Sequence, residues 1–239
     1  MVIHDELKSI IEDFTEDNAE DSYRKFYVLS QEVLRTEEDG VETIVRIRQH
    51  LCASDSPVFR SYGLLFLGAA VDAIAKMSSS NSEVTGLGQF LISEVSSLAD
   101  FRNFDERDHY IHFVSHLAYL GLALSDAGVL SKSEAATLAR EICAMYGLSK
   151  SAYFLNEPFV VGELILMLCK GQPEVLKSAF EAFQLENAEQ ELGLVQGAIL
   201  RANYDYLCMA ISLMNAKYEI APDVPIQTYV DNLLDRIHG

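Results

Sequence analysis

One stretch of the chain, residues 54–77, strongly limits the folds that the chain can adopt. After a short polar turn it is apolar for most of twenty residues, and its helical part carries only three charged residues: Arg60, Asp72 and Lys76. Exposing so much apolar surface to water is unfavourable, so the segment must be buried. Neighbouring helices therefore have to cover it on most of its sides.

Apolar residues recur every three or four positions along most of the chain, which predicts helices. We expect them near residues 3–14, 23–34, 41–51, 57–77, 83–100, 106–124, 131–146, 159–170, 173–185 and 226–237. Residues 189–217 form either one long helix or two, because Gly193, Gly197 and Asn203 leave a break open. No segment alternates with the two-residue period of a strand. The sequence predicts an all-α protein of about ten or eleven helices in consecutive antiparallel hairpins, in a single domain of residues 1–239.

Residues 55–68 resemble the turn and second helix of a HEAT repeat. The resemblance consists of an acidic turn with proline, an apolar residue before arginine, and small residues before Leu-Gly: Asp55, Ser56, Pro57, Val58, Phe59, Arg60, Gly63, Leu64, Leu67 and Gly68. Residues 173–183 resemble a weaker second copy, in which Lys177 stands one place late for the arginine. Small residues such as Gly63 and Gly68 also let neighbouring helices approach closely. The resemblance implies a HEAT-like α-solenoid of stacked hairpins; since no regular repeat period extends over the chain, an irregular helical bundle stays the alternative.

The chain is strongly acidic, with 36 acidic and 18 basic residues and a formal net charge of −18. This charge repels nucleic acids and anionic membranes and favours basic partners, so we expect no nucleic acid and no membrane among the partners. The longest apolar runs, 61–71 and 158–169, are shorter than the roughly 20 residues that span a bilayer. Four widely spaced cysteines and an acidic N-terminus are typical of a protein of a reducing compartment without a signal peptide, so the expected location is cytoplasmic.

Acidic residues gather in two segments of the chain. These residues are Glu16, Asp17, Glu20 and Asp21 in the first segment, and Glu186, Glu189 and Glu191 in the second. They form either a solvated outer face or an acidic docking surface that steers a basic protein toward the chain.

A cluster of histidines is the most suggestive candidate for chemistry. Asp105, His109, His112 and His116 would project within an arc of about 60° if one helix carried them all. Imidazole is a common ligand of zinc, iron or nickel. Because His109 and His116 would lie about 10 Å apart along the axis, one ion could take only an adjacent pair and would need ligands from another helix. The cluster is therefore a metal or ligand site, a pH-sensitive or partner-contacting face, or a set of ordinary half-buried histidines.

Other signatures of catalysis are absent from the sequence, which contains no GxSxG, HExxH, P-loop or complete GxGxxG motif. The preferred interpretation is a non-catalytic interaction module (a scaffold, adaptor or inhibitor) that presents an acidic helical surface to a basic protein and needs no cofactor. The alternative is a helical enzyme or ligand-binding protein with a pocket near His109, His112 and His116. A homo-oligomer is a third hypothesis, if the very apolar helix at 57–77 or at 158–170 is exposed.

Overall fold

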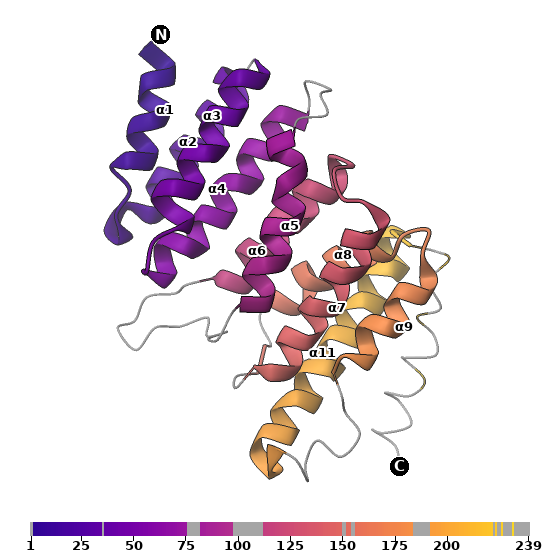
Figure 1. The fold of residues 1–239 in the computed structure, drawn as a ribbon. Coiled ribbons are helices and arrows are strands. Elements are labelled where there is room, and N and C mark those ends of the chain that lie inside the picture. Colours follow the sequence, from indigo (N-terminus) through magenta and orange to yellow (C-terminus); the bar gives the residue numbers. More distant parts are fainter. Residues whose placement is uncertain are drawn as a thin grey trace. The chain divides into compact units, whose positions relative to one another are not determined.

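A computed structural model gives the arrangement of the chain (Figure 1). It describes residues 2–34, 36–75, 82–97, 112–149, 152–153, 156–183, 192–221, 223, 226 and 231. Across these ranges the chain forms ten α-helices and two short helical turns, with no strand, which confirms the all-α prediction. The chain divides into two compact units: Met1–Leu91 with Asn103–Leu130 (unit 1), and Ile92–Arg102 with Ser131–Gly239 (unit 2). The single domain predicted for residues 1–239 stays a prediction.

Unit 1 is built around a row of three helices. Its elements are α1 (Val2–Glu12), η1 (Glu16–Asn18), α2 (Ala19–Val33), α3 (Glu37–Ile47), the π-helical turn η2 (Arg48–Cys52), α4 (Pro57–Ala75), α6 (Phe113–Asp126) and the first part of α5 (Ser82–Ser97). Helix α4 packs against α2 and α6, while α3 contacts α4 and α1 contacts both α2 and α3. The apolar stretch of the sequence thus becomes the middle helix of the unit.

Helix α4 is enclosed along most of its length. Every residue from 61 to 71 is buried. By length and composition α4 is the one described helix that could cross a membrane, and 78% of that stretch is buried inside the protein. Ser56 caps its start, because Ser56 Oγ accepts a hydrogen bond from the backbone N–H of Phe59 (3.4 Å). The helix therefore has the surroundings of a core helix.

Two glycines let other elements reach the backbone of α4, as predicted. A Cβ atom on Gly68 would lie 2.6 Å from the ring of Tyr119 on α6, and one on Gly63 would lie 2.7 Å from Cys52 Sγ. Neither neighbour could stay where it is if a methyl group were added, since such contacts are far inside van der Waals distance. The two glycines set the spacing between α4 and its neighbours.

Unit 2 contains α7 (Lys132–Leu148), α8 (Glu157–Cys169), α9 (Pro173–Glu181) and α11 (Leu194–Tyr218). Helix α7 packs against α9, α8 packs against α11, and α7 and α8 also contact each other. A capping box starts α7, in which Ser131 Oγ accepts from the Glu134 N–H and the Glu134 carboxylate accepts from the Ser131 N–H. Residues 194–218 form one continuous helix, so the chain does not break at Gly197 or Asn203. Gly193 has a positive φ of 82° and precedes the first helical residue, and residues 189–191 lie outside the described residues.

Three predicted helices begin at other residues in the structure, and one of them, expected at 23–34, begins at Ala19. Of the helix expected at 106–124, residues 106–111 lie outside the described residues. Within the described part, α6 begins at Phe113, because His112 has a left-handed backbone with φ of 51° and stands before the first helical residue. The helix expected at 41–51 starts earlier, at Glu37, and its last turn is π-helical. The helix expected at 226–237 lies almost entirely outside the described residues.

Candidate functional site

Four of the predicted partner-binding acids lie together in unit 1. Glu16 and Asp17 belong to η1, Glu20 and Asp21 lie in the first turn of α2, and all four side chains are exposed. We call these four residues the acidic corner. The partial positive charge at the N-terminus of α2 stabilises carboxylates at this position. The local helix geometry therefore accounts for the clustering of the four acids.

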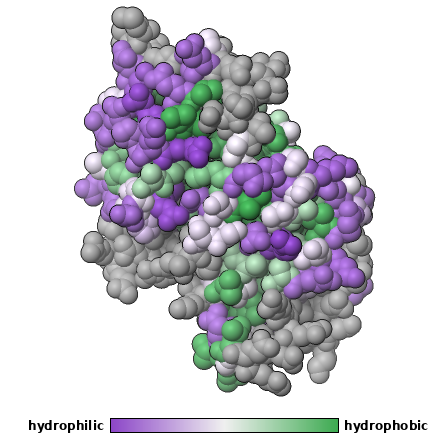
Figure 2. Space-filling model, in the orientation of Figure 1, coloured by the Kyte–Doolittle hydropathy of each residue, from purple (hydrophilic) through white to green (hydrophobic). Residues whose placement is uncertain are grey.

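The acidic corner keeps most of its negative charge. Glu20 pairs with Arg24 (3.2 Å), and Glu16 accepts a hydrogen bond from Ser56 Oγ (2.7 Å). Among the described residues, no basic side chain lies within ion-pair distance of Asp17 or Asp21. Figure 2 shows hydrophilic residues gathered over this end of unit 1. The corner is a compact source of negative potential.

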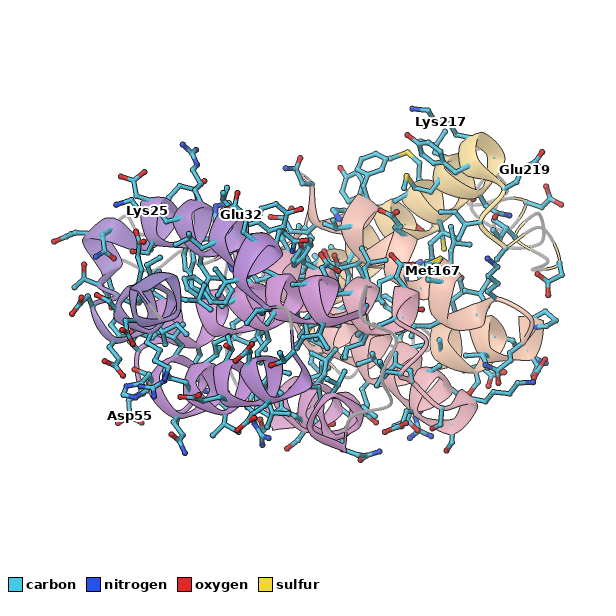
Figure 3. All side chains as sticks on the ribbon, turned by 90° about the horizontal axis from the view of Figure 1, so that it is seen from above. Lys25, Glu32, Asp55, Met167, Lys217 and Glu219 are labelled. Atoms are coloured by element: carbon cyan, nitrogen blue, oxygen red, sulfur yellow. The ribbon has the colours of Figure 1, made fainter. Side chains whose placement is uncertain are left out.

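Two other bases of unit 1, Lys8 and Arg46, are bound to acids outside the acidic corner. Lys8 Nζ lies 2.6 Å from Glu42 Oε1, and Arg46 bridges Glu12 and Glu42. Hydrogen bonds from Lys8 and then Arg46 hold the pKa of Glu42 below its usual value. On α2 itself, Lys25 and Glu32 project on one side of the unit, and Asp55 lies on the opposite side (Figure 3).

The other predicted site residues are only partly described. Glu186, Glu189 and Glu191 lie outside the described residues, and so do Asp105 and His109. The structure brings together the two remaining histidines, whose rings stack with centroids 5.5 Å apart. His112 is half-buried before the first turn of α6, and His116 is buried within that helix.

His116 is held inside the helix row of unit 1. Its Nδ1 lies 2.9 Å from Ser61 Oγ of α4, with the donor set by the imidazole tautomer, and its ring meets the Tyr62 ring edge-on at 4.9 Å. Burial, and then the neighbouring His112, lower the pKa of His116 to about 3. The imidazole is therefore neutral at pH 7, and one of its nitrogens is already bound.

A second polar contact joins α4 and α6, and it also involves α2. The Tyr119 hydroxyl donates to Asp72 Oδ2 (2.8 Å), and Tyr23 of α2 interacts with the Tyr119 hydroxyl. Burial is the main cause that raises the pKa of Tyr119, and it raises the pKa of Tyr23 to about 12. The Tyr62 hydroxyl donates to Glu20 Oε2 (3.4 Å), so the ring that contacts His116 also contacts the acidic corner.

Unit 2 contains a buried polar residue that the sequence indicated only as a break point. Asn203 of α11 is fully buried, accepts from the Tyr153 N–H (2.8 Å) and donates to the Tyr146 carbonyl (3.2 Å). These two hydrogen bonds connect α11 to the end of α7, through Tyr146, and to Tyr153. The sequence contains a signal for this role, because Asn203 is a single amide on the apolar helix face that Leu200 and Leu207 define.

Burial shifts the pKa values of these groups away from neutral pH. Acid–base or nucleophilic chemistry requires a base with a pKa near the working pH or a nucleophile with a lowered pKa. Here burial moves the buried tyrosines and the Cys143 thiol away from ionisation and keeps His116 neutral. Within the described ranges, no three His, Cys, Asp or Glu side chains could hold a metal ion together. No protein-family model, curated protein or solved structure matches the chain.

Proposed function

We propose that the chain is a non-catalytic interaction module, a scaffold, adaptor or inhibitor, that presents the acidic corner to a basic protein. The observation that carries this proposal is the exposure of Glu16, Asp17, Glu20 and Asp21 with Arg24 as their one described ion-pair partner. The charge of the whole chain, −18, adds to the attraction. Such a field accelerates the encounter with a basic partner more than it strengthens the final complex.

The helix arrangement supports a HEAT-like α-solenoid as the frame of this module. Within unit 1, α4 packs between α2 and α6, and α1 contacts α3; within unit 2, α7 contacts α9. Packing between alternate helices is typical of stacked hairpins. Stacked hairpins present extended surfaces to partner proteins, which suits an interaction module. An irregular bundle is the competing arrangement.

The expected setting follows from charge and thiol chemistry. A net charge of −18 disfavours nucleic acids and anionic membranes as partners. All four cysteines are buried and reduced, which suits a cytoplasmic protein. We include both points in the proposal.

The test measures association with a fluorescent peptide of about 20 lysines, which stands in for a basic protein surface. A variant with Glu16→Gln, Asp17→Asn, Glu20→Gln and Asp21→Asn removes the acidic corner. We expect its association rate constant at low salt to fall about tenfold, because the local field is lost. The wild-type rate should also fall steeply as salt is added.

The matched control removes the same number of exposed acids elsewhere: Glu38, Asp126, Glu174 and Glu181, each changed to its amide. Its association rate should fall by about twofold at most, because only the net charge changes. Equal losses in both variants would mean that the acidic corner has no special role. A wild-type rate that is insensitive to salt would contradict the whole proposal.

A further inference from the structure

Helix α11 is apolar on two opposite faces. One face is buried in unit 2 and includes Gly197, Leu200, Tyr204, Leu207 and Ile211. The other face carries large apolar side chains in water: Val195 is 74% exposed and Leu213 is 54% exposed. Figure 2 shows hydrophobic residues gathered at the end of unit 2 where α11 begins. Exposed apolar surface of this extent marks an interaction site on a folded protein.

The exposed residues form one straight seam. Its members are apolar, and each is exposed or half-buried: Val195, Ala198, Ala202, Tyr206, Met209, Leu213 and Ala216. At 100° per residue they fall within an arc of about 80°, on the side opposite the buried face. Their spacing of three or four residues is the pattern by which one helix packs along another. We call these seven residues the α11 seam.

The helices that pack against α11 in the described chain are α8 and α7. In unit 1, by comparison, α4 has α2 on one side and α6 on the other. Lys217, which borders the α11 seam, points away from the other helices of unit 2 (Figure 3). The seam thus occupies the position at which a further helix would extend the packing of unit 2.

Large and small side chains follow one another along the α11 seam in an order that lets two copies of the helix pack in antiparallel orientation. In an antiparallel pair centred between residues 205 and 206, Val195 faces Ala216, Ala198 faces Leu213, and Ala202 faces Met209. Every such pair joins a larger side chain to an alanine, which lets two helices approach closely without a clash. Tyr206 of each copy lies beside the two-fold axis. A two-fold interface requires this kind of self-complementarity.

Charge also favours a second copy at this place. The chain has twice as many acids as bases, yet α11 carries one acid, Asp205, and two bases, Arg201 and Lys217. The α11 surfaces themselves therefore contribute little to the repulsion between molecules of net charge −18, apart from Asp205, which lies beside the two-fold axis. Depletion of charged residues is a property of the core of protein interfaces.

We infer that the α11 seam is the interface of an antiparallel homodimer, in which each copy packs its seam on the other. The contact runs for about 32 Å along the helix pair, at 1.5 Å per residue. Dimerisation through the α11 seam does not involve the acidic corner, and its dependence on salt is opposite to that of binding a basic partner. Salt screens the repulsion between two acidic molecules, so dimerisation strengthens as salt is added, whereas binding of a basic partner weakens.

The first test is sedimentation equilibrium of the full chain from about 1 to about 100 µM, at low and high salt. We expect a monomer–dimer equilibrium in which the dissociation constant falls with salt. Leu213→Glu should raise that constant at least about tenfold, because it replaces a large apolar contact of each copy by a charge. The matched control is Leu148→Glu in the same unit, at a side chain that is 68% exposed and lies outside the seam. The control should leave the equilibrium unchanged.

The second test addresses the antiparallel register. Ala198→Leu places two leucines against each other in the proposed pair and should weaken the dimer. The double variant Ala198→Leu with Leu213→Ala restores one small and one large residue at each crossing, so dimerisation should recover. Tyr206→Cys should form an intermolecular disulfide under mild oxidation, because the two copies of residue 206 lie beside the axis. Leu148→Cys serves as its control and should not.

Three results would overturn the inference. A monomer at about 100 µM in both salts would show that the seam meets a different partner or another segment of the chain. A dimer that persists unchanged in Leu213→Glu would place the interface elsewhere. Failure of the double variant to recover would exclude the antiparallel register. Circular dichroism of each variant confirms that a loss of dimer is not a loss of fold.

Discussion

His116 shows how a single buried residue couples the stability of unit 1 to pH. Its folded-state pKa is about 3, whereas the ordinary value is 6.5. Below pH 6.5 the unfolded chain binds a proton that the folded chain does not bind. The folded state therefore loses stability as pH falls, by up to about 1.4 kcal/mol per pH unit from this residue alone, until the pH approaches 3.

We expect His116→Asn to be less stable than the wild type at pH 7 by about 1–2 kcal/mol, because a buried ring contact is lost. Between pH 6.5 and pH 4, however, its free energy of unfolding should decline less steeply than that of the wild type. Urea denaturation across this range measures both effects. His50→Asn changes an exposed histidine and is the control. Parallel pH profiles for His116→Asn and the wild type would refute the coupling.

Two glycines give opposite predictions for the same substitution. Gly68→Ala should destabilise unit 1 by about 1–3 kcal/mol, since the new methyl group would lie 2.6 Å from the Tyr119 ring. Gly86→Ala meets nothing within 4 Å and should stabilise α5 by up to about 1 kcal/mol, through helix propensity alone. Thermal denaturation of the two variants measures the difference. Equal shifts of the melting temperature would show that the α4–α6 contact is not tight.

At the scale of single elements, the N-terminal cap of α7 can be read from the sequence, as Ser131 followed by Glu134, and the structure contains it as a capping box. Ser131→Ala removes the hydroxyl that accepts from the Glu134 N–H and should cost about 1 kcal/mol of stability. Ser133→Ala lies in the same first turn, on an exposed side chain outside the capping box, and should have little effect. Chemical denaturation distinguishes them, and equal effects would mean that the hydroxyl at 131 has no capping role.

The sequence predicted those elements whose signals are local. Helices α4, α7 and α8 were predicted because apolar residues recur along them at helical spacing, and a capping residue or a proline also stands at the start of each. The start of α6 was wrong because the periodic pattern continues through residue 112, where the left-handed backbone of His112 precedes the helix. Periodicity also concealed the α11 seam, since a helix that is apolar on both faces has no contrast between a core side and a water side.

For the candidate site too, the sequence predicted the features that depend on local signals and missed those that depend on tertiary contacts. The exposure of the acidic corner follows from charge and from its place at a helix start. Ser61 and His116 are separated by 55 positions in the sequence, and Asp72 and Tyr119 by 47 positions. These contacts therefore depend on tertiary packing, which no local sequence pattern predicts. The same packing removes the reason given for a homo-oligomer, because α4 and most of α8 are buried. The exposed apolar surface lies on α11 instead.

At the scale of the whole molecule, charge and apolar surface are separated along the sequence. The acids of the acidic corner come early in the chain, in unit 1, and the α11 seam comes late, in unit 2. One molecule could therefore hold a basic partner through unit 1 while unit 2 holds a second copy. The two activities can be removed separately, and their opposite salt dependence keeps the failure of one distinct from the failure of the other.

The four buried cysteines allow the opening of the two units to be timed. Cys52 lies in unit 1, and Cys143, Cys169 and Cys208 lie in unit 2. A thiol reagent reaches them only when the surrounding helices separate, so each added mass records an opening event. If the units open independently, mass spectrometry during labelling in urea should detect molecules carrying one or three adducts. Molecules with only zero or four adducts would instead reveal a single cooperative fold.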